Sequence, residues 1–197
     1  MARTRAKDYD EKRGLVLKGA AALFARDGYD RASMSSLAAE LGVSKALLYH
    51  YYSSKEALLF DIIETHLQTL LDAVEEADAP DAEPEERLYL LISGILDAYR
   101  DADDEHKVQI GALHVLPDDQ QDAIRSIERR IVRIVADAVL ALNPALNDGR
   151  TDLKPATMSL FGMLNWFYMW FREGGSLTRE DYSKMVSTIF IGGVRKL

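Results

Sequence analysis

The sequence predicts an all-helical protein, and three features of the 197-residue chain support this fold class. Apolar residues recur at three- and four-residue steps in one segment after another, which is the spacing of a buried helix face. No segment alternates apolar and polar residues as a half-buried strand does, and glycine or proline follows most of the helical segments. We expect a small N-terminal domain over residues 1–53 and a larger helical domain over residues 54–197.

Composition limits the class of protein. Apolar residue types make up 48% of the chain, which is enough for a buried core. Without cysteine the chain has neither a disulfide framework nor a thiolate metal site, and its four histidines show no close metal-ligand spacing. The sequence also lacks a glycine-rich phosphate loop and a nucleophile motif, so we expect no enzyme, no cofactor and no metal. It has no membrane segment or signal peptide, so we expect a cytoplasmic protein.

The N-terminal domain opens with a predicted helix over residues 10–27, which Gly28 ends. Its inner face carries Leu15, Ala20, Ala21, Leu23 and Phe24. Residues 1–7 hold three basic side chains, Arg3, Arg5 and Lys7, without periodicity. Two interpretations stay open for them: a disordered polar tail, or an arm that reaches phosphates or a minor groove.

Two short helices joined by a tight turn are predicted next. Ser33 is placed to cap the first of them, and Gly42 allows the left-handed turn that ends it. Ser44 can cap the second, residues 45–52, whose period turns Leu48 and Tyr52 inward. The residues left on its outer side are Lys45, Ala46, Leu47, Tyr49 and His50. This is the pattern of a helix-turn-helix, in which the second helix touches DNA.

Residues 11–60 resemble the DNA-binding domain of the tetracycline-repressor (TetR) family of bacterial transcription factors. The matching residues are Ala22-Leu23-Phe24, Gly28-Tyr29, Ser33, Leu37-Ala38, Gly42-Val43-Ser44-Lys45, Leu48-Tyr49, Tyr52 and Lys55-Glu56-Ala57-Leu58. The chain departs from the family pattern at Ala46-Leu47, where Gly-Thr is common. A leucine there can contact a thymine methyl but cannot donate a hydrogen bond to a base.

The resemblance implies a ligand-responsive repressor that binds a palindromic operator in double-stranded DNA as a homodimer. Carried over to this chain, the DNA-contacting residues are Ser33, Ser35, Ser44, Lys45, Ala46, Leu47, Tyr49, His50 and Lys55. We expect Lys45 and Tyr49 at phosphates or bases, and His50 at the backbone. The alternatives are that Tyr49 only packs and that His50 is simply an exposed polar residue. Lys55 is expected at a phosphate, while Ser33 either caps its helix, contacts a phosphate, or does both.

The charge distribution agrees with DNA binding at one end of the chain. Residues 1–60 carry ten Lys and Arg against seven Asp and Glu, whereas residues 61–197 are net −11 within a chain of net charge −8. Because phosphate contacts need positive charge, this division favours docking through the N-terminal domain.

The larger domain opens with a long helix, predicted over residues 54–76. Ser53 and Glu56 have the spacing of a capping box. An apolar stripe runs along the helix through Leu58, Leu59, Ile62, Ile63, Leu67, Leu70, Leu71 and Val74. At about 1.5 Å per residue the helix spans roughly 30 Å, so it could act as a lever between the N-terminal domain and the larger domain.

Three helices are predicted after the lever. One runs from near Pro84 to Tyr99 and ends at the acidic residues 101–105, one covers residues 107–116, and one covers residues 118–142. The last carries four arginines, Arg125, Arg129, Arg130 and Arg133. These arginines either form a solvated face that pairs with acidic neighbours or bind an anionic ligand.

Residues 158–172 are apolar on nearly all sides, yet the stretch is too short to cross a bilayer. A soluble helix of this kind must be covered on every side, and we expect a second copy of the chain to cover it. Gly174-Gly175 would end it, and Thr178 would cap a last helix. Two helices from each of two subunits would then form a four-helix dimer seam.

A small-molecule effector is expected in a tunnel through the larger domain. Its predicted lining is His66, Leu70, Tyr99, Ile110, His114, Met163, Trp166 and Phe167. The run from Phe161 to Trp166 looks like the corresponding helix of TetR-type regulators of fatty-acid, sterol and phenylacetate breakdown, which respond to acyl-CoA thioesters. We therefore expect an acyl-CoA, with its phosphates at Arg129, Arg130 or Arg133. The alternatives are a multidrug-efflux repressor that senses hydrophobic drugs, and a helical acyl-binding or interaction module without a role at DNA.

Overall fold

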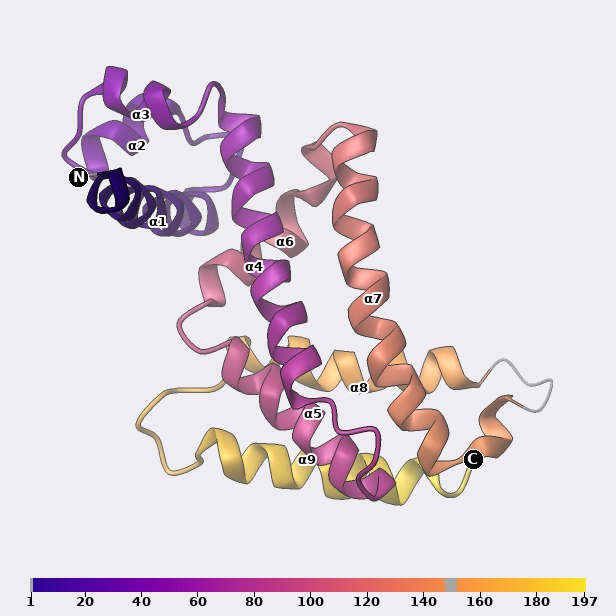
Figure 1. Ribbon diagram of the computed structural model, residues 1–197. Coiled ribbons are helices and arrows are strands. Elements are labelled where there is room, and N and C mark those ends of the chain that lie inside the picture. Colours follow the sequence, from indigo (N-terminus) through magenta and orange to yellow (C-terminus); the bar gives the residue numbers. More distant parts are fainter. Residues whose placement is uncertain (1, 148–151) are drawn as a thin grey trace. The chain divides into compact units, whose positions relative to one another are not determined.

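The protein is described from a computed structural model that covers residues 2–147 and 152–197, with the side chains of residues 2–8, 10 and 147 left out. Within these residues all regular structure is helical, as the sequence predicts (Figure 1). The elements are α1 (Ala2–Asp27), α2 (Met34–Glu40), α3 (Lys45–Tyr51), α4 (Lys55–Ala77), α5 (Pro84–Ala98), α6 (Asp103–Ala112), η1 (Leu113–Val115), α7 (Asp118–Leu142), η2 (Pro144–Asn147), α8 (Leu153–Asn165), η3 (Phe167–Met169) and α9 (Arg179–Val194).

The chain packs as two compact units, and two helices contribute to both. The first unit holds residues 1–67 and 102–125, and the second holds residues 68–101 and 126–197. Both α4 and α7 run unbroken from one unit into the other. The predicted domain boundary after residue 53 falls just before α4, whereas packing places the first thirteen residues of α4 with the first unit.

The first unit is built around the packing of α1 on α2 and on α6. Ala20, Ala21 and Leu48 are fully buried, and Gly19 lies so close to α2 that a Cβ there would come within 2.4 Å of a Leu41 methyl group. Gly28 and Gly42 both adopt the left-handed backbone conformation, with φ of 84° and 66°. The two predicted turn glycines are therefore confirmed, because this conformation is strained for residues that carry a Cβ.

Two predictions about α1 need correction. The helix begins at Ala2 and not at residue 10, so residues 2–7 are helical and do not form an unstructured tail. The side chains of Arg3, Arg5 and Lys7 lie outside the described residues. Leu15, assigned to the inner face, is 69% exposed. Charged residues without glycine or proline continue a helix readily, which explains the early start.

The starts of α4 and α6 also differ from prediction. Ser54, not Ser53, caps α4, because its Oγ accepts a hydrogen bond from the backbone N–H of Ala57 at 3.1 Å. Helix α6 begins at Asp103 and ends at Ala112, where η1 follows, so the acidic residues open a helix and do not merely end one. Carboxylates in a first helical turn are favourable because they face the positive end of the helix dipole.

The second unit is centred on α5, which packs against α9 and α8. Leu88, Leu91, Ile92, Ile95 and Leu96 are fully buried along α5. A Cβ added at Gly94 would lie 2.8 Å from the Cβ of Ala77, so α5 passes unusually close to the end of α4. The helix predicted over residues 118–142 matches the bounds of α7. Pro84 lies in the first turn of α5 and Thr178 caps α9, both as predicted.

The predicted helix over residues 158–172 is wrong in its second half. Helix α8 ends at Asn165, whose Oδ1 accepts a hydrogen bond of 2.7 Å from the buried Tyr99 hydroxyl. The chain then turns through η3, where the Phe167 ring stacks on Phe171 at 4.2 Å and on Tyr182 at 4.8 Å. Stacked aromatic rings thus follow α8 where the sequence predicted that the helix continues. Across the described residues, no helix combines the length and apolarity needed to cross a membrane.

Candidate nucleic-acid interface

Helix α3 has one buried side and one exposed side. Ser44 caps it, since its Oγ accepts from the backbone N–H of Leu47 at 3.1 Å. Leu48 is fully buried and Tyr52 nearly so, which confirms the predicted inner side. The outer residues Lys45, Ala46, Leu47, Tyr49 and His50 are exposed, as is Ser44. A seven-residue helix that leaves nearly all of its polar residues in solvent is arranged to contact another molecule.

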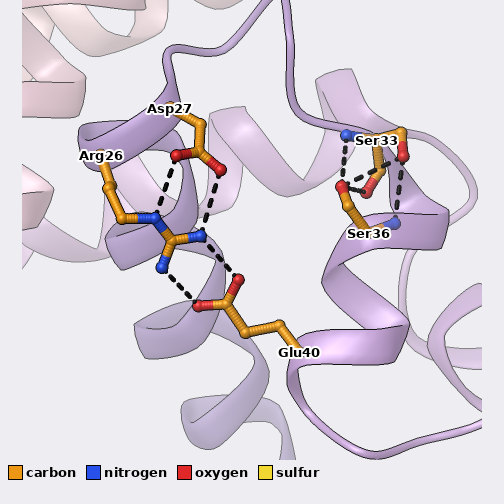
Figure 2. A network of polar contacts seen from close by, with 5 residues as sticks. All are labelled: Arg26, Asp27, Ser33, Ser36 and Glu40. Atoms are coloured by element: carbon orange, nitrogen blue, oxygen red, sulfur yellow. Dashed lines mark hydrogen bonds and ion pairs between the residues drawn. The ribbon is translucent and has the colours of Figure 1, made fainter.

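The start of α2 is held by two serines that cap each other. The Ser33 Oγ accepts from the Ser36 N–H, and the Ser36 Oγ accepts from the Ser33 N–H, both at 3.0 Å (Figure 2). The predicted capping role of Ser33 is therefore confirmed. Ser35, the second residue of α2, is exposed and does not belong to this pair. A phosphate contact by Ser33 or Ser35 stays a prediction.

Arg26 ties the end of α1 to the end of α2. Its guanidinium lies between two carboxylates, with both Glu40 oxygens at 2.8 Å and the Asp27 oxygens at 3.0 and 3.1 Å (Figure 2). A planar guanidinium suits such two-point contacts, which fix direction as well as distance. The network joins the ends of the two helices, and sequence reasoning did not find it because Arg26 and Glu40 are fourteen residues apart.

Lys55 makes contacts inside the first unit that its predicted role did not include. Its Nζ donates to the backbone carbonyls of Tyr29 at 2.8 Å and Ala32 at 3.1 Å, and lies 4.0 Å from the centre of the Tyr29 ring. A phosphate would compete with these three contacts for the same ammonium group. The structure therefore shows Lys55 supporting the turn before α2 through carbonyls that the sequence does not reveal, and its contact with a phosphate stays a prediction.

A carboxylate on α4 joins three segments of the first unit. Asp61 Oδ1 accepts from Arg13 Nη2 of α1 at 2.5 Å, and Asp61 Oδ2 accepts from the hydroxyl of Tyr52, the residue that ends α3. Thr65, one turn later on α4, donates to Oδ1 at 3.3 Å. Burial, and then the hydrogen bond to Asp61, raise the pKa of Tyr52. Sequence reasoning predicted that Tyr52 is buried but missed this partner.

Helix α1 adds an aromatic residue beside α3 that sequence reasoning also missed. The ring of Tyr9 lies 4.8 Å from that of Tyr51, and His50 meets Tyr51 edge-on at 5.7 Å. Tyr9 is exposed, so the row of aromatic rings continues from α3 onto α1. The prediction of a helix that starts at residue 10 left Tyr9 outside any element.

The predicted effector residues in the first unit lie in different surroundings. His66 is buried, with its ring centre 5.7 Å from that of His106. Ile110 is 57% exposed on α6. A cavity of about 480 Å³ lies between the end of α1, the turn after it and α6 with η1, and His114 lines its wall. Among the predicted effector residues, His114 is the one that lines this cavity.

The predicted effector residues of the second unit are also divided. Leu70, Tyr99 and Phe167 are buried, and the backbone carbonyl of Met163 accepts from the Tyr182 hydroxyl at 3.0 Å. Trp166 is 61% exposed, so within its unit it faces solvent and not an enclosed tunnel. The continuous lining expected from the sequence stays a prediction.

The four arginines of α7 differ in whether they form ion pairs. Arg130 pairs with Glu75 at 2.6 Å, and Arg125 pairs with Asp122 at 3.5 Å. Arg129 and Arg133 are exposed and form no ion pair with any residue that the structure describes. Two of the four arginines thus pair with acidic neighbours, and the binding of an anionic ligand stays a prediction. The covered residues contain no group of three or more His, Asp or Glu arranged to hold a metal ion.

Comparison with known proteins assigns the N-terminal helix-turn-helix region and the C-terminal helices to one family. Residues 16–62 match the family described as bacterial regulatory proteins, tetR family, and residues 81–194 match the tetracyclin repressor-like C-terminal domain. The chain belongs to the TetR family. Its α2 and α3 are therefore the DNA-binding helix-turn-helix of a transcriptional regulator.

Relatives with solved structures match the TetR-family chain over nearly its whole length. A TetR-family transcriptional regulator from Bordetella parapertussis 12822 is 34% identical, with a TM-score of 0.86 over 94% of this chain and 96% of that one. AibR, solved in complex with isovaleryl coenzyme A and operator DNA, is 25% identical, with a TM-score of 0.74 over 92% of this chain and 96% of that one.

A curated relative extends the comparison. The transcriptional repressor KstR2 of Mycobacterium tuberculosis is 27% identical over 95% of this chain and 94% of its own length. The proteins matched are transcription regulators, not enzymes, and the match argues against a helical module without a role at DNA.

Proposed function

We propose that the chain is a ligand-responsive transcriptional repressor of the cytoplasm that binds a near-palindromic operator as a homodimer. The observation that carries the proposal is the two-sided α3, in which Leu48 and Tyr52 anchor the helix and its other residues are exposed. The repressor KstR2, similar over almost the whole chain, supports repression as the outcome of binding. Two copies of α3 would enter successive major grooves of the operator.

The exposed residues of α3 are proposed to make different contacts with DNA. Lys45 and Tyr49 contact phosphates or bases, His50 contacts the backbone, and Leu47 meets a thymine methyl. Ser33 and Ser35 at the start of α2 face a phosphate. Lys55 acts behind the interface, because its ammonium holds the carbonyls of Tyr29 and Ala32.

Replacing Tyr49 tests the interface directly. Tyr49→Ala removes an exposed ring from α3, and we expect operator affinity to fall about tenfold, equivalent to ~1.4 kcal/mol of binding free energy. A gel shift with the upstream DNA of the gene measures the affinity, and size-exclusion chromatography checks that the dimer is intact. Tyr89→Ala on α5, in the second unit, is the matched control and should bind normally. Unchanged affinity in Tyr49→Ala would remove Tyr49 from the interface.

The proposed effector is an acyl-CoA thioester. AibR, which is similar in fold and 25% identical, was solved with isovaleryl coenzyme A, and two exposed arginines of α7 are available to phosphates. Binding would favour a state in which α4 tilts and changes the distance between the two copies of α3. Since half-sites have a fixed spacing, a small tilt is enough to release the operator.

Calorimetric titration with a panel of acyl-CoA thioesters tests the effector. We expect heat from at least one thioester, and weaker binding in the double variant Arg129→Ala/Arg133→Ala. Arg125→Ala, which removes an arginine already paired with Asp122, serves as the control. If no thioester gives heat while a neutral hydrophobic drug binds, the alternative of a multidrug-efflux repressor is preferred.

A further inference from the structure

Helix α3 is short, and its C-terminal end depends on few contacts. It has seven residues, of which Leu48 is the buried one, and Tyr52 ends it. Ser44 fixes its N-terminal end through a side-chain cap. At the other end the Tyr52 side chain crosses to α4, where its hydroxyl donates to Asp61. Tyr49 and His50, which are expected at DNA, lie in the turn next to this contact.

Asp61 is suited to hold this end because both of its oxygens are used. Oδ2 accepts from Tyr52 and Oδ1 accepts from Arg13, so one carboxylate on α4 contacts the end of α3 and the middle of α1. The Asp61 side chain is only 14% exposed, and the guanidinium compensates its charge. Hydrogen bonds to a charged group in such partly buried sites are stronger than those between neutral groups.

Helix α4 also contacts the segment that precedes α2, at the start of the helix-turn-helix. Lys55, six residues before Asp61 on α4, donates to the carbonyls of Tyr29 and Ala32 in the segment before α2. The first two turns of α4 therefore contact the chain both before α2 and after α3. Two attachments on one rigid helix restrain rotation of the helix-turn-helix, which a single attachment would not.

We propose that Asp61 is a positioning residue for DNA recognition, which locks α3 to α4 through the Tyr52 hydroxyl so that the two helices move as one body. The inference rests on the proposed function, because it explains how a tilt of α4 would reach the exposed side of α3. Loss of the lock would leave the charge of the interface unchanged but allow α3 to take several orientations. Operator binding, which needs one orientation, would suffer more than binding to unrelated DNA, which depends mainly on charge.

Tyr52→Phe is the sharpest test, because it removes one hydroxyl and keeps the buried ring. We expect affinity for the operator to fall about fivefold, the size of one lost hydrogen bond, while affinity for a non-operator duplex of equal length stays the same. Tyr182→Phe is the matched control, since it removes a hydroxyl that donates to the Met163 carbonyl from a similarly buried ring in the second unit. Its ratio of operator to non-operator affinity should equal that of the wild type.

A double-mutant cycle tests whether Tyr52 and Asp61 act as a pair. The loss in Tyr52→Phe/Asp61→Asn should be no larger than in Asp61→Asn alone, because both changes remove the same contact. Amide hydrogen exchange without DNA gives a second readout, in which Tyr52→Phe should speed exchange in the last turn of α3 but not in α2.

The outcomes separate this inference from the proposed function. A wild-type ratio of affinities in Tyr52→Phe, or unchanged exchange in α3, would overturn the positioning role while operator binding itself stands. A wild-type protein that does not distinguish its operator from other DNA would instead overturn the proposed function, and the exchange measurement would still decide whether Asp61 holds α3.

Discussion

The imidazole of His66 is buried in the first unit among groups that oppose its protonation. Burial, and then the charges of His106 and Lys18, lower the pKa of His66 to about 4. Lys18 itself pairs with Glu105 at 3.7 Å, so a carboxylate is also near. His66 therefore stays neutral near pH 7, and its protonation is coupled to unfolding of the first unit.

This pKa predicts a loss of stability in weak acid. The ordinary pKa of histidine is near 6.5, so between about pH 6.5 and 4 the unfolded chain binds more protons than the folded one. The free energy of unfolding should fall as the pH drops through this range, with a loss of about 2 kcal/mol from His66 at pH 5. Urea denaturation at pH 7 and pH 5 measures it.

The variant His66→Gln isolates the contribution. Glutamine fills a similar volume without a titratable group, so its loss of stability between pH 7 and pH 5 should be smaller than that of the wild type by roughly the same 2 kcal/mol. An equal loss in both proteins would assign the acid sensitivity to other groups.

At the scale of the element, two neighbouring leucines of α3 have different roles: one stabilises the fold, and the other is expected to contact DNA. Leu48 is fully buried, whereas Leu47 is 41% exposed. We expect Leu48→Ala to lower the free energy of unfolding by about 2–5 kcal/mol, the cost of an emptied core position. Leu47→Ala should change it little but weaken operator binding. Thermal denaturation and a gel shift on both variants check this, and a large loss of stability in Leu47→Ala would contradict the observed orientation of α3.

The elements that could be predicted from sequence are those fixed by local signals. Ser33, Ser44 and Thr178 cap their helices as predicted, and α7 has its predicted bounds, because caps and helical periodicity depend on residues a few positions apart. The early end of α8 could not be predicted, since the contacts around it join residues far apart in the sequence, such as Asn165 and Tyr99, which are sixty-six positions apart. The partners of Lys55 and Asp61 were missed for the same reason.

The candidate site follows the same rule. The outward residues of α3 were predicted because a short helix with two anchors has only one outer side. The effector lining was less accessible to prediction. It joined residues from α4, α6 and α8 and from the connections after α5, α6 and α8, and the structure shows that Ile110 and Trp166, among them, are exposed.

At the scale of the whole molecule, the exposed apolar side chains of α8 and α9 support the proposed dimer. Met158 on α8 and Met185 and Ile189 on α9 are about half exposed, and a second subunit would remove such apolar side chains from solvent. Ile189→Asp would place a charge in the dimer seam, and we expect the dissociation constant of the dimer to rise about a hundredfold or more. Analytical ultracentrifugation measures it, and operator affinity should fall in parallel.

Ile110→Asp is the control for this change. Ile110 has nearly the same exposed fraction as Ile189, at 57% against 59%, but lies on α6 of the first unit. The variant should remain dimeric. If Ile189→Asp is also dimeric at micromolar concentration, the seam does not include this part of α9.

The turn after α8 gives the molecule a built-in optical probe. Both tryptophans of the chain, Trp166 and Trp170, flank η3 in the second unit and are about half exposed. Fluorescence excited selectively in tryptophan therefore reports on the second unit alone, while the first unit is followed through its tyrosines. A ligand or a second subunit that covers Trp166 would shift the emission to shorter wavelength, so binding to the second unit can be recorded without any label.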